Sequence, residues 1–230
     1  MNERGRSDPF HLCFDHLIPV KTSELVVSSQ LFNRMKDELA PEEFPLAFRE
    51  LAAHRAGRSF DRDLIEFRYW SRRVAPPQGP GGHQHRGALT LVRVEECVIC
   101  GREPVRWSYY CPRCRGFVFR HTRAQRHHIR AMREAWSEEE DGFLCHYTGV
   151  RVDDDDPGSP WYLSFDHGIP GDNETLVIAA WWVNAMKSAL SAEEFWKVVE
   201  EYDRYLREGG EFDRDVVGFS YWSRGGRKRG

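Results

Sequence analysis

An internal repeat constrains this chain more than any other feature of its sequence. The residues FDHLIP at 14–19 recur as FDHGIP at 165–170, an offset of 151 residues (166 − 15 = 151 for the two aspartates). Further matches keep this offset or add one residue to it. They are LVV with LVI (25–27, 176–178), NRMK with NAMK (33–36, 184–187), EEF (42–44, 193–195), FDRD (60–63, 212–215) and YWSR (69–72, 221–224). Such a series in register predicts two related structural units.

The repeat divides the 230 residues into four predicted parts. Residues 1–73 form the first repeat and residues 137–230 the second. Residues 74–94 are predicted to be a linker, because their Pro- and Gly-rich start is incompatible with regular structure. The linker ends with ALTLVRV at 88–94, a candidate short strand. Residues 95–136 have no counterpart in the first repeat and are expected to form a separate module.

The second repeat has the pattern of two strands followed by helices. Residues 143–150 and 161–167 are predicted to be strands, and the turn between them carries four Asp, a Pro and a Gly. Residues 175–190 begin extended and become helical. Ser191, with a Glu three residues later, predicts a capping box for another helix. The predicted class is therefore α+β. Only 14 residues precede Asp15, so the first strand of the first repeat is expected to be short or missing.

Four cysteines in the module predict a structural zinc site. They form two Cys-x-x-Cys pairs, CVIC and CPRC, which are separated by ten residues. Four thiolates complete a tetrahedral shell and leave no open position for chemistry, so the zinc is expected to add folding free energy to a segment too small for its own core. The predicted ligands are Cys97, Cys100, Cys111 and Cys114. The remaining two, Cys13 and Cys145, are expected to be small buried residues.

The charge of the chain is unevenly distributed. Residues 102–133 contain nine Arg and one acidic residue, a balance of +8, whereas the whole chain has a net charge of −3. Residues 120–136 are predicted to form a helix on which four arginines share one face: Arg123, Arg126, Arg130 and Arg133. Such a row predicts contacts with nucleic-acid phosphates. The alternative is the solvated face of a surface helix. His127 and His128 are expected to make surface or phosphate contacts.

The motifs of the second repeat resemble those of the HNH (ββα-metal) nuclease family. The matching residues lie within roughly 143–190 and are CHYTG (145–149), DHGIP (166–170), LVI (176–178) and NAMK (184–187). The resemblance implies two ββα-metal units with helical tails and a metal-dependent endonuclease that hydrolyses DNA, with RNA a less favoured substrate. Thr175 stands where many members have Asn, which leaves the orientation of the catalytic histidine unexplained.

The resemblance also assigns roles to individual residues. His167 is expected to act as the general base, because a neutral imidazole near pH 7 can accept a proton from water. Asp166 and Asn184 are expected to hold Mg²⁺ or Mn²⁺, since hard cations prefer oxygen ligands. The cation would stabilise the charge that develops on the phosphate. Lys187, one turn after Asn184, is expected to contact a phosphate.

The first repeat contains the same residue types, namely Asp15, His16 and Asn33. It is either a second active site or a supporting unit. In the supporting unit, residues 88–94, or a second chain in a homodimer, would supply the missing strand. The alternative function for the whole chain is a catalytically degenerate, zinc-containing DNA-binding protein that uses the repeats as a scaffold.

No apolar run reaches membrane-spanning length, and the polar N-terminus lacks the apolar core of a signal peptide. The sequence therefore predicts a cytoplasmic protein without a membrane partner.

Overall fold

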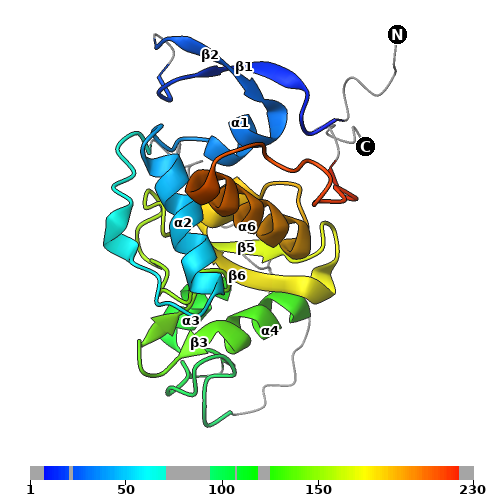
Figure 1. Cartoon of the computed structure of the whole chain (residues 1–230). Helices are drawn as coiled ribbons and strands as arrows, with labels where there is room; N and C mark the ends of the chain where they lie inside the picture. The colour runs from blue at the N-terminus through cyan, green and yellow to red at the C-terminus, as the bar shows by residue number, and fades with distance from the viewer. Residues whose placement is uncertain (1–7, 21–22, 71–93, 107, 119–124, 223–230) are drawn as a thin grey trace, which may run out of the picture.

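The computed structural model describes residues 8–20, 23–70, 94–106, 108–118 and 125–222. Within these ranges the protein has a mixed α/β structure with three antiparallel sheets of two strands each (Figure 1). The prediction of a protein that combines α-helices with antiparallel strands is confirmed to this extent. Arg123 and nearly all of the candidate strand at 88–94 lie outside the described residues.

The first repeat forms a hairpin followed by two helices. Strand β1 (Leu12–His16) pairs with β2 (Leu25–Ser29), and α1 (Gln30–Lys36) follows directly. The hydroxyl of the last strand residue, Ser29, accepts a hydrogen bond from the backbone of α1 and so caps the helix. Helix α2 (Glu43–Arg55) comes next, and the short 3-10 helix η2 (Arg62–Leu64) follows it.

The second repeat has the same order of elements. Strand β5 (Leu163–His167) pairs with β6 (Leu176–Ala180), with the 3-10 helix η4 (Asn173–Thr175) in the connection. Helix α5 (Trp181–Lys187) follows β6, and α6 (Ala192–Glu208) follows α5. Each cross-strand pair of the first hairpin recurs in the second at the offset of 151 residues. The sequence repeat therefore coincides with matched local structure.

The hairpin of the second repeat is not the one predicted from the sequence. Residues 163–167 do form a strand, but their partner is β6 and not 143–150. The strand β4 (Gly142–Phe143) at the start of that segment pairs with β3 (Trp136–Ser137), and Leu144 makes an isolated antiparallel bridge with Arg151. Residues 145–149 instead make a turn, which closes when the backbone N–H of Gly149 donates to the carbonyl of Cys145. Gly149 has a φ of +66°, which favours glycine and ends any strand there.

The helices join the two repeats. Helix α2 packs along α6, and α1 contacts α5 (Figure 1). The predicted capping box of α6 is confirmed: the Ser191 hydroxyl accepts from the N–H of Glu194, and the Glu194 carboxylate accepts from the N–H of Ser191. Helices α2 and α6 occupy equivalent places in the two repeats, so equivalent elements join the repeats.

The segments that follow α2 and α6 cross over to the opposite repeat. Two phenylalanines after α2 contact tryptophans of the second repeat, and their two counterparts after α6 contact phenylalanines of the first repeat. The ring pairs and their centroid distances are Phe60–Trp161 (5.7 Å), Phe67–Trp182 (5.6 Å), Phe212–Phe32 (5.3 Å) and Phe219–Phe10 (5.4 Å). Each repeat therefore supplies part of the other's core.

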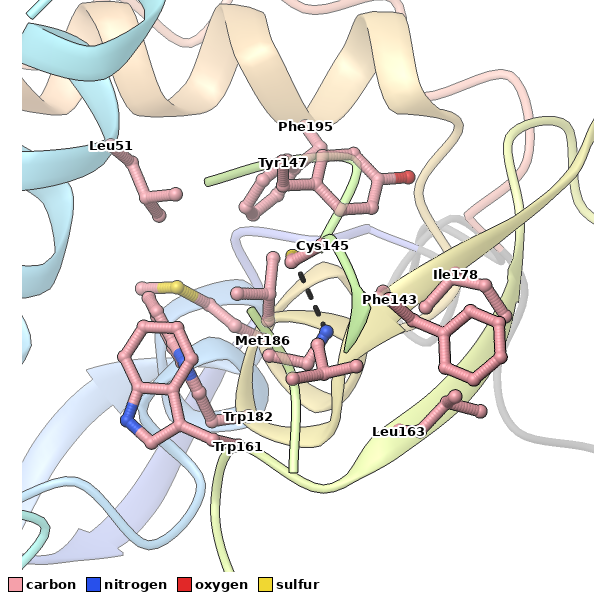
Figure 2. Close-up of a cluster of buried hydrophobic side chains, with 14 of the residues drawn as sticks. Leu51, Phe143, Cys145, Tyr147, Trp161, Leu163, Ile178, Trp182, Met186 and Phe195 are labelled. Atoms are coloured by element: carbon pink, nitrogen blue, oxygen red, sulfur yellow. Dashed lines mark hydrogen bonds between the residues drawn. The ribbon is translucent and has the colours of Figure 1, made fainter. Parts of the chain in front are cut away.

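One cluster of buried side chains runs through both repeats and the cysteine module. Leu51 of α2 belongs to the same buried cluster as Phe195 and Tyr147 of the second repeat (Figure 2). Phe117 of the module packs on Phe143 with 5.8 Å between ring centroids. The sequence divides the chain into four parts, but the described residues of both repeats and of the cysteine module share a single buried core.

The module contributes two helices, α3 (Pro112–Phe117) and α4 (Arg126–Ala135). Helix α4 confirms most of the helix predicted for 120–136 and lies against β6 (Figure 1). Ala131 and Met132, on its inner side, are buried. The module therefore covers the outer face of the hairpin β5–β6.

Candidate functional site

The four predicted zinc ligands converge in the structure. The sulfur atoms of Cys97, Cys100, Cys111 and Cys114 all lie within 4.8 Å of one another, and all four residues are buried. The Sγ atom of Cys100 is 3.5 Å from that of Cys111 and 3.6 Å from that of Cys114. Tetrahedral thiolates around zinc are about 3.8 Å apart, given the usual Zn–S distance. The donor set and its geometry fit a metal such as zinc, as predicted.

The backbone around the cysteines is shaped for this convergence. The N–H of Gly101 donates to the carbonyl of Cys97, and the φ of Gly101 is +72°, so glycine suits the turn. Cys111 caps α3 by accepting the N–H of Cys114 at its sulfur. Burial raises the pKa of Cys100 to about 11 and also raises the pKa of Cys114. Coordination by a metal would therefore be needed to convert these thiols to thiolates near neutral pH.

The other two cysteines lie apart from this cluster. Cys145 is buried, as predicted, and its sulfur accepts the backbone N–H of Ala180 (Figure 2). Cys13 is half-buried.

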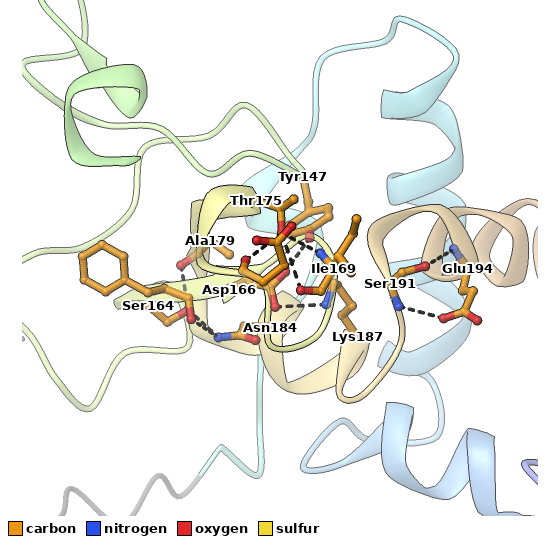
Figure 3. Close-up of polar contacts among 12 residues, drawn as sticks. Tyr147, Ser164, Asp166, Ile169, Thr175, Ala179, Asn184, Lys187, Ser191 and Glu194 are labelled. Carbon is orange, nitrogen blue, oxygen red and sulfur yellow. Dashed lines mark hydrogen bonds and ion pairs between the residues drawn. The ribbon is translucent and has the colours of Figure 1, made fainter. Parts of the chain in front are cut away.

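Asp166 lies in a closed polar network. Its carboxylate is buried, with Oδ1 accepting from Nζ of Lys187 at 3.0 Å and Oδ2 accepting from the Tyr147 hydroxyl at 2.5 Å (Figure 3). Burial, reinforced by the negative charge of Asp166, raises the pKa of Tyr147, so the phenol remains a donor. Lys187 was predicted to contact a phosphate, and the structure contradicts this: its side chain is 1% exposed and its charge is neutralised by Asp166.

Asn184 is fixed next to this network. Its amide nitrogen donates to the carbonyl of Phe165 at 3.1 Å and to the hydroxyl of Ser164 at 3.2 Å (Figure 3). Because a backbone carbonyl only accepts, the nitrogen of the amide must face Phe165, and Oδ1 is the end available to a further donor or a cation. The residue is half-buried.

The carboxylate of Asp166 and the amide oxygen of Asn184 are ligands of the kind that a hard cation prefers, since carboxylate and amide oxygens are the usual ligands of Mg²⁺. Each oxygen of Asp166 also keeps a second lone pair. The ammonium of Lys187, however, already stands at the position that a cation would take on Oδ1. A divalent ion therefore fits at Asp166 and Asn184 only if Lys187 moves away from the carboxylate, because two cations at one carboxylate repel each other.

His167 stands at the end of β5 and is half-buried. Its Nε2 lies 3.1 Å from Oδ1 of Asn173, so Nε2 carries the proton and Nδ1 is the acceptor of the neutral ring. Arg130 of α4 donates to the backbone carbonyls of Asn173 and Glu174, at 3.2 Å and 2.6 Å, and pairs with the Glu174 carboxylate. The helix of the module thus holds the segment that orients His167.

Thr175, which stands where many HNH-family members have Asn, binds backbone groups of the connection between the strands. Its hydroxyl accepts the backbone N–H of Ile169 at 2.8 Å and donates to the carbonyl of Asp172 at 2.9 Å. It closes the connection between the strands, which brings Asn173 to His167. The contact from Asn173 supplies the orientation that the sequence left unexplained.

The first repeat arranges its counterparts similarly. Asn33 donates to the carbonyl of Phe14 at 3.2 Å, and Lys36 pairs with Asp15 at 3.0 Å. In both repeats, then, an Asn and a Lys fasten the helix to the strand that carries Asp-His. The histidines differ, because Nδ1 of His16 faces the hydroxyl of Ser23 at 3.4 Å.

No described residue donates to Asp15 in the way that the Tyr147 hydroxyl donates to Asp166. A cavity of about 410 Å³ opens there instead, lined by Asp15, Lys36, Phe32 and Tyr202 among others. The carboxylate of the first repeat therefore lacks the second donor that closes the network around Asp166.

The predicted basic face is partly used within the molecule. Arg126 and Arg133 are exposed on α4, whereas Arg130 is engaged with the residues 173–174. Two other arginines of the basic segment, Arg102 and Arg113, pair with Asp141 and Asp154. Only part of the +8 segment is thus available to a polyanion.

The Asp-rich turn anchors neighbouring segments. Asp153 binds Arg62 of the first repeat at 2.8 Å, and Asp154 binds Arg113 of the module. His128 was expected at the surface, but its ring packs on Phe165 at 4.6 Å.

Sequence reasoning missed the roles of Tyr147, Asn173 and Arg130. Tyr147 was visible in CHYTG, but as a residue of a strand. Asn173 lies only two positions before Thr175, yet its contact depends on the path of the connection. Nothing in the sequence distinguished Arg130 from its neighbours in the arginine row.

Comparisons with protein-family models, curated proteins and solved structures gave no match. Among the described residues, no helix combines the length and the apolar character needed to cross a membrane. The class that the structure defines is a mixed α/β protein with a four-cysteine cluster that could bind zinc.

Proposed function

We propose that the second repeat is an HNH-type endonuclease unit that hydrolyses DNA phosphodiester bonds. The observation that carries the proposal is the arrangement at the end of β5. There a half-exposed His167 directly follows Asp166 and is oriented by Asn173, and Asn184 is locked to the same strand. His167, Asp166 and Asn184 are the residues that the resemblance to the HNH family selects.

The histidine supplies the base. With its Nε2 proton donated to Asn173, the neutral ring of His167 accepts a proton from water at Nδ1. Mg²⁺ or Mn²⁺, held by Oδ1 of Asn184 and by Asp166 after displacement of Lys187, would stabilise negative charge on the phosphate. Asn184 keeps its oxygen at a fixed place because both amide hydrogens are bound.

The first repeat is proposed to support the second one. His16 faces a serine hydroxyl, and Asp15 opens into a cavity, so this site lacks the arrangement around His167. Helix α2 and the phenylalanines that follow it nevertheless complete the core of the second repeat. This division of roles assigns cleavage to one site per chain.

DNA is proposed to lie along α4. Arg126 and Arg133 are exposed there, and the helix contacts the strand next to His167. Arginines of this kind neutralise phosphates without reading bases, so the binding should weaken steeply with salt. The choice of DNA over RNA follows the family resemblance alone.

A second candidate function is a DNA-binding protein without catalysis. The observation that favours it is the buried Lys187, which neutralises Asp166 in the way that a metal would. In that case the residues shared by both repeats fasten helix to strand, and the zinc module with its arginines binds DNA.

A plasmid-nicking assay distinguishes the two. Under the nuclease proposal, supercoiled DNA is cut with Mg²⁺ or Mn²⁺ and not with EDTA, and His167→Ala lowers the rate by about 100-fold or more. His16→Ala is the matched control, and it should cut at the rate of the unmodified chain. Salt-sensitive binding without cutting under either metal would instead establish the second candidate.

A further inference from the structure

The two hairpins differ in how their outer faces are covered. In the first hairpin four apolar side chains on the face away from α1 are exposed to solvent: Leu12 is 71%, Phe14 73%, Leu25 56% and Val27 66% exposed. Their counterparts at the offset of 151 residues are Leu163, Phe165, Leu176 and Ile178. Of these, Phe165 is half-buried and the other three are at most 2% exposed. We call the four exposed side chains of the first hairpin the outer face.

The cysteine module and the turn at 145–149 together explain the difference. Helix α4 lies against β6, His128 packs on Phe165, and the backbone N–H of His146 donates to the carbonyl of Ile178. Nothing equivalent lies over β1 and β2 in the described part of the chain, where the hairpin stands at one end of the molecule (Figure 1).

An uncovered face of this kind is unfavourable for an isolated chain. A hairpin of two strands is marginally stable unless one face packs on something. The inner face of β1–β2 packs on α1, but the outer face leaves a contiguous apolar patch of about 500 Å² in water, estimated from the usual areas of such side chains.

We infer that the outer face is the contact surface between two copies of this chain. β1 and β2 place no Asp, Glu, Lys or Arg on this face, so it offers no charge to attract nucleic acid or to select a charged partner. A flat apolar face is complementary to itself. Two copies packed face to face would bury about 1,000 Å², which is the lower limit for a specific interface. The assembly is therefore a weak dimer, and this inference is independent of the proposed nuclease activity.

Sedimentation of the full chain tests the inference. The unmodified protein should pass from monomer to dimer over about 1 to 100 µM, as expected for a dissociation constant in the micromolar range. Phe14→Glu places a charge in the centre of the outer face and should keep the chain monomeric throughout. The matched control is Leu64→Glu, because Leu64 is also exposed, at 40%, but lies in η2 away from the hairpin. It should dimerise normally.

Folding of the variants is checked by circular dichroism and melting temperature. Since Phe14 is exposed within one chain, Phe14→Glu should melt like the unmodified monomer. Val27→Ser serves as a milder second variant that should raise the dissociation constant about tenfold or more. A monomer at every concentration would overturn the inference, and so would a dimer that persists in both variants. A lowered melting temperature of the Phe14→Glu monomer would also overturn it, because the same chain would then cover the face.

Discussion

At the residue scale, replacement of Asn173 tests whether the orientation of His167 can be lost while the fold remains stable. Asn173→Ala removes the acceptor at Nε2 of His167, so the ring loses its fixed tautomer. Under the proposed mechanism the cleavage rate should fall about 10- to 100-fold, with little change in DNA affinity or melting temperature. Nicking rates and a binding titration on the same plasmid measure the two effects.

Asn173→Asp is the matched variant. It keeps an oxygen acceptor, so cleavage should largely survive, but the added negative charge should raise the pH at which the rate begins to rise. Equal losses of rate in both variants, without a change in the pH profile, would argue against an orienting role.

The pH dependence of stability can be assigned to another histidine. Burial, together with the nearby His127 and His167, lowers the pKa of His128 to about 4, and its buried Nδ1 has no hydrogen-bond partner among the described residues. The unfolded chain takes up the proton near pH 6.5, before the folded chain does. His128 therefore stabilises the fold fully above pH 6.5, and this stability is lost as the pH falls toward 4.

Replacing His128 by Phe keeps a ring against Phe165 but removes the titration. Urea unfolding of this variant should show a smaller loss of unfolding free energy between pH 6.5 and 4 than the unmodified chain. Burial also lowers the pKa of His146, so part of the slope should remain. The exposed His11, changed to Gln, is the control and should leave the slope unaltered.

The sequence predicted which residues matter at the hairpin more reliably than what they contact. The repeat selected Asp166, Asn184 and Lys187 because all three recur at one offset. It did not reveal that Lys187 is buried, because that depends on Tyr147, which comes from a turn 19 residues before Asp166. A repeat shows equivalence between positions, whereas burial depends on what packs over them.

At the element scale, the incorrect strand pairing has a local cause. The apolar composition of residues 143–150 is typical of a strand, but short apolar runs cannot be assigned from periodicity alone. In the structure Gly149 turns the chain back, and Cys145 faces β6 from outside the hairpin. The helices were easier to predict, since the cap at Ser191 is decided by residues three positions apart.

The cysteine cluster is expected to hold the module on the hairpin. Removal of zinc with a chelator should loosen α3 and α4 and uncover Ile178 and its neighbours on β5–β6. We expect the melting temperature to fall by on the order of 10 °C, because a few kcal/mol correspond to that shift in a chain of this size. Metal analysis should give one zinc per chain.

Cys114→Ser should reproduce the effect of chelation and lower the zinc content, while Cys13→Ser should change neither. Cys13 is the matched control because it lies outside the cluster and is half-buried. A zinc content that is unchanged in Cys114→Ser would contradict the site.

At the scale of the whole molecule, the segment that follows the long helix of each repeat, α2 or α6, packs on the other repeat. Phe60 and Phe67 leave the first repeat to pack on Trp161 and Trp182, and Arg62 between them binds Asp153. The sequence indicated two units but gave no sign that each would complete the other, because contacts between distant segments leave no periodic signal.

This packing across the repeats predicts that neither repeat is stable alone. A chain of residues 95–230 keeps the cysteine module and the proposed active site but loses α2 from the side of α6 and both phenylalanines from the two tryptophans. The lost burial should exceed about 5 kcal/mol, which is comparable to the total stability of many domains. This fragment should therefore show no cooperative thermal transition by circular dichroism, and co-expression with residues 1–94 should restore one.

A finer test uses the full chain. Phe67→Ala should lower the unfolding free energy by about 3–5 kcal/mol, as expected for a buried aromatic side chain, although the residue lies outside the repeat that it supports. Leu64→Ala, three positions earlier and exposed, should cost less than about 1 kcal/mol. If residues 95–230 melt cooperatively and Phe67→Ala is no more damaging than Leu64→Ala, the repeats are independent. The first repeat would then have to be explained by something other than support of the second.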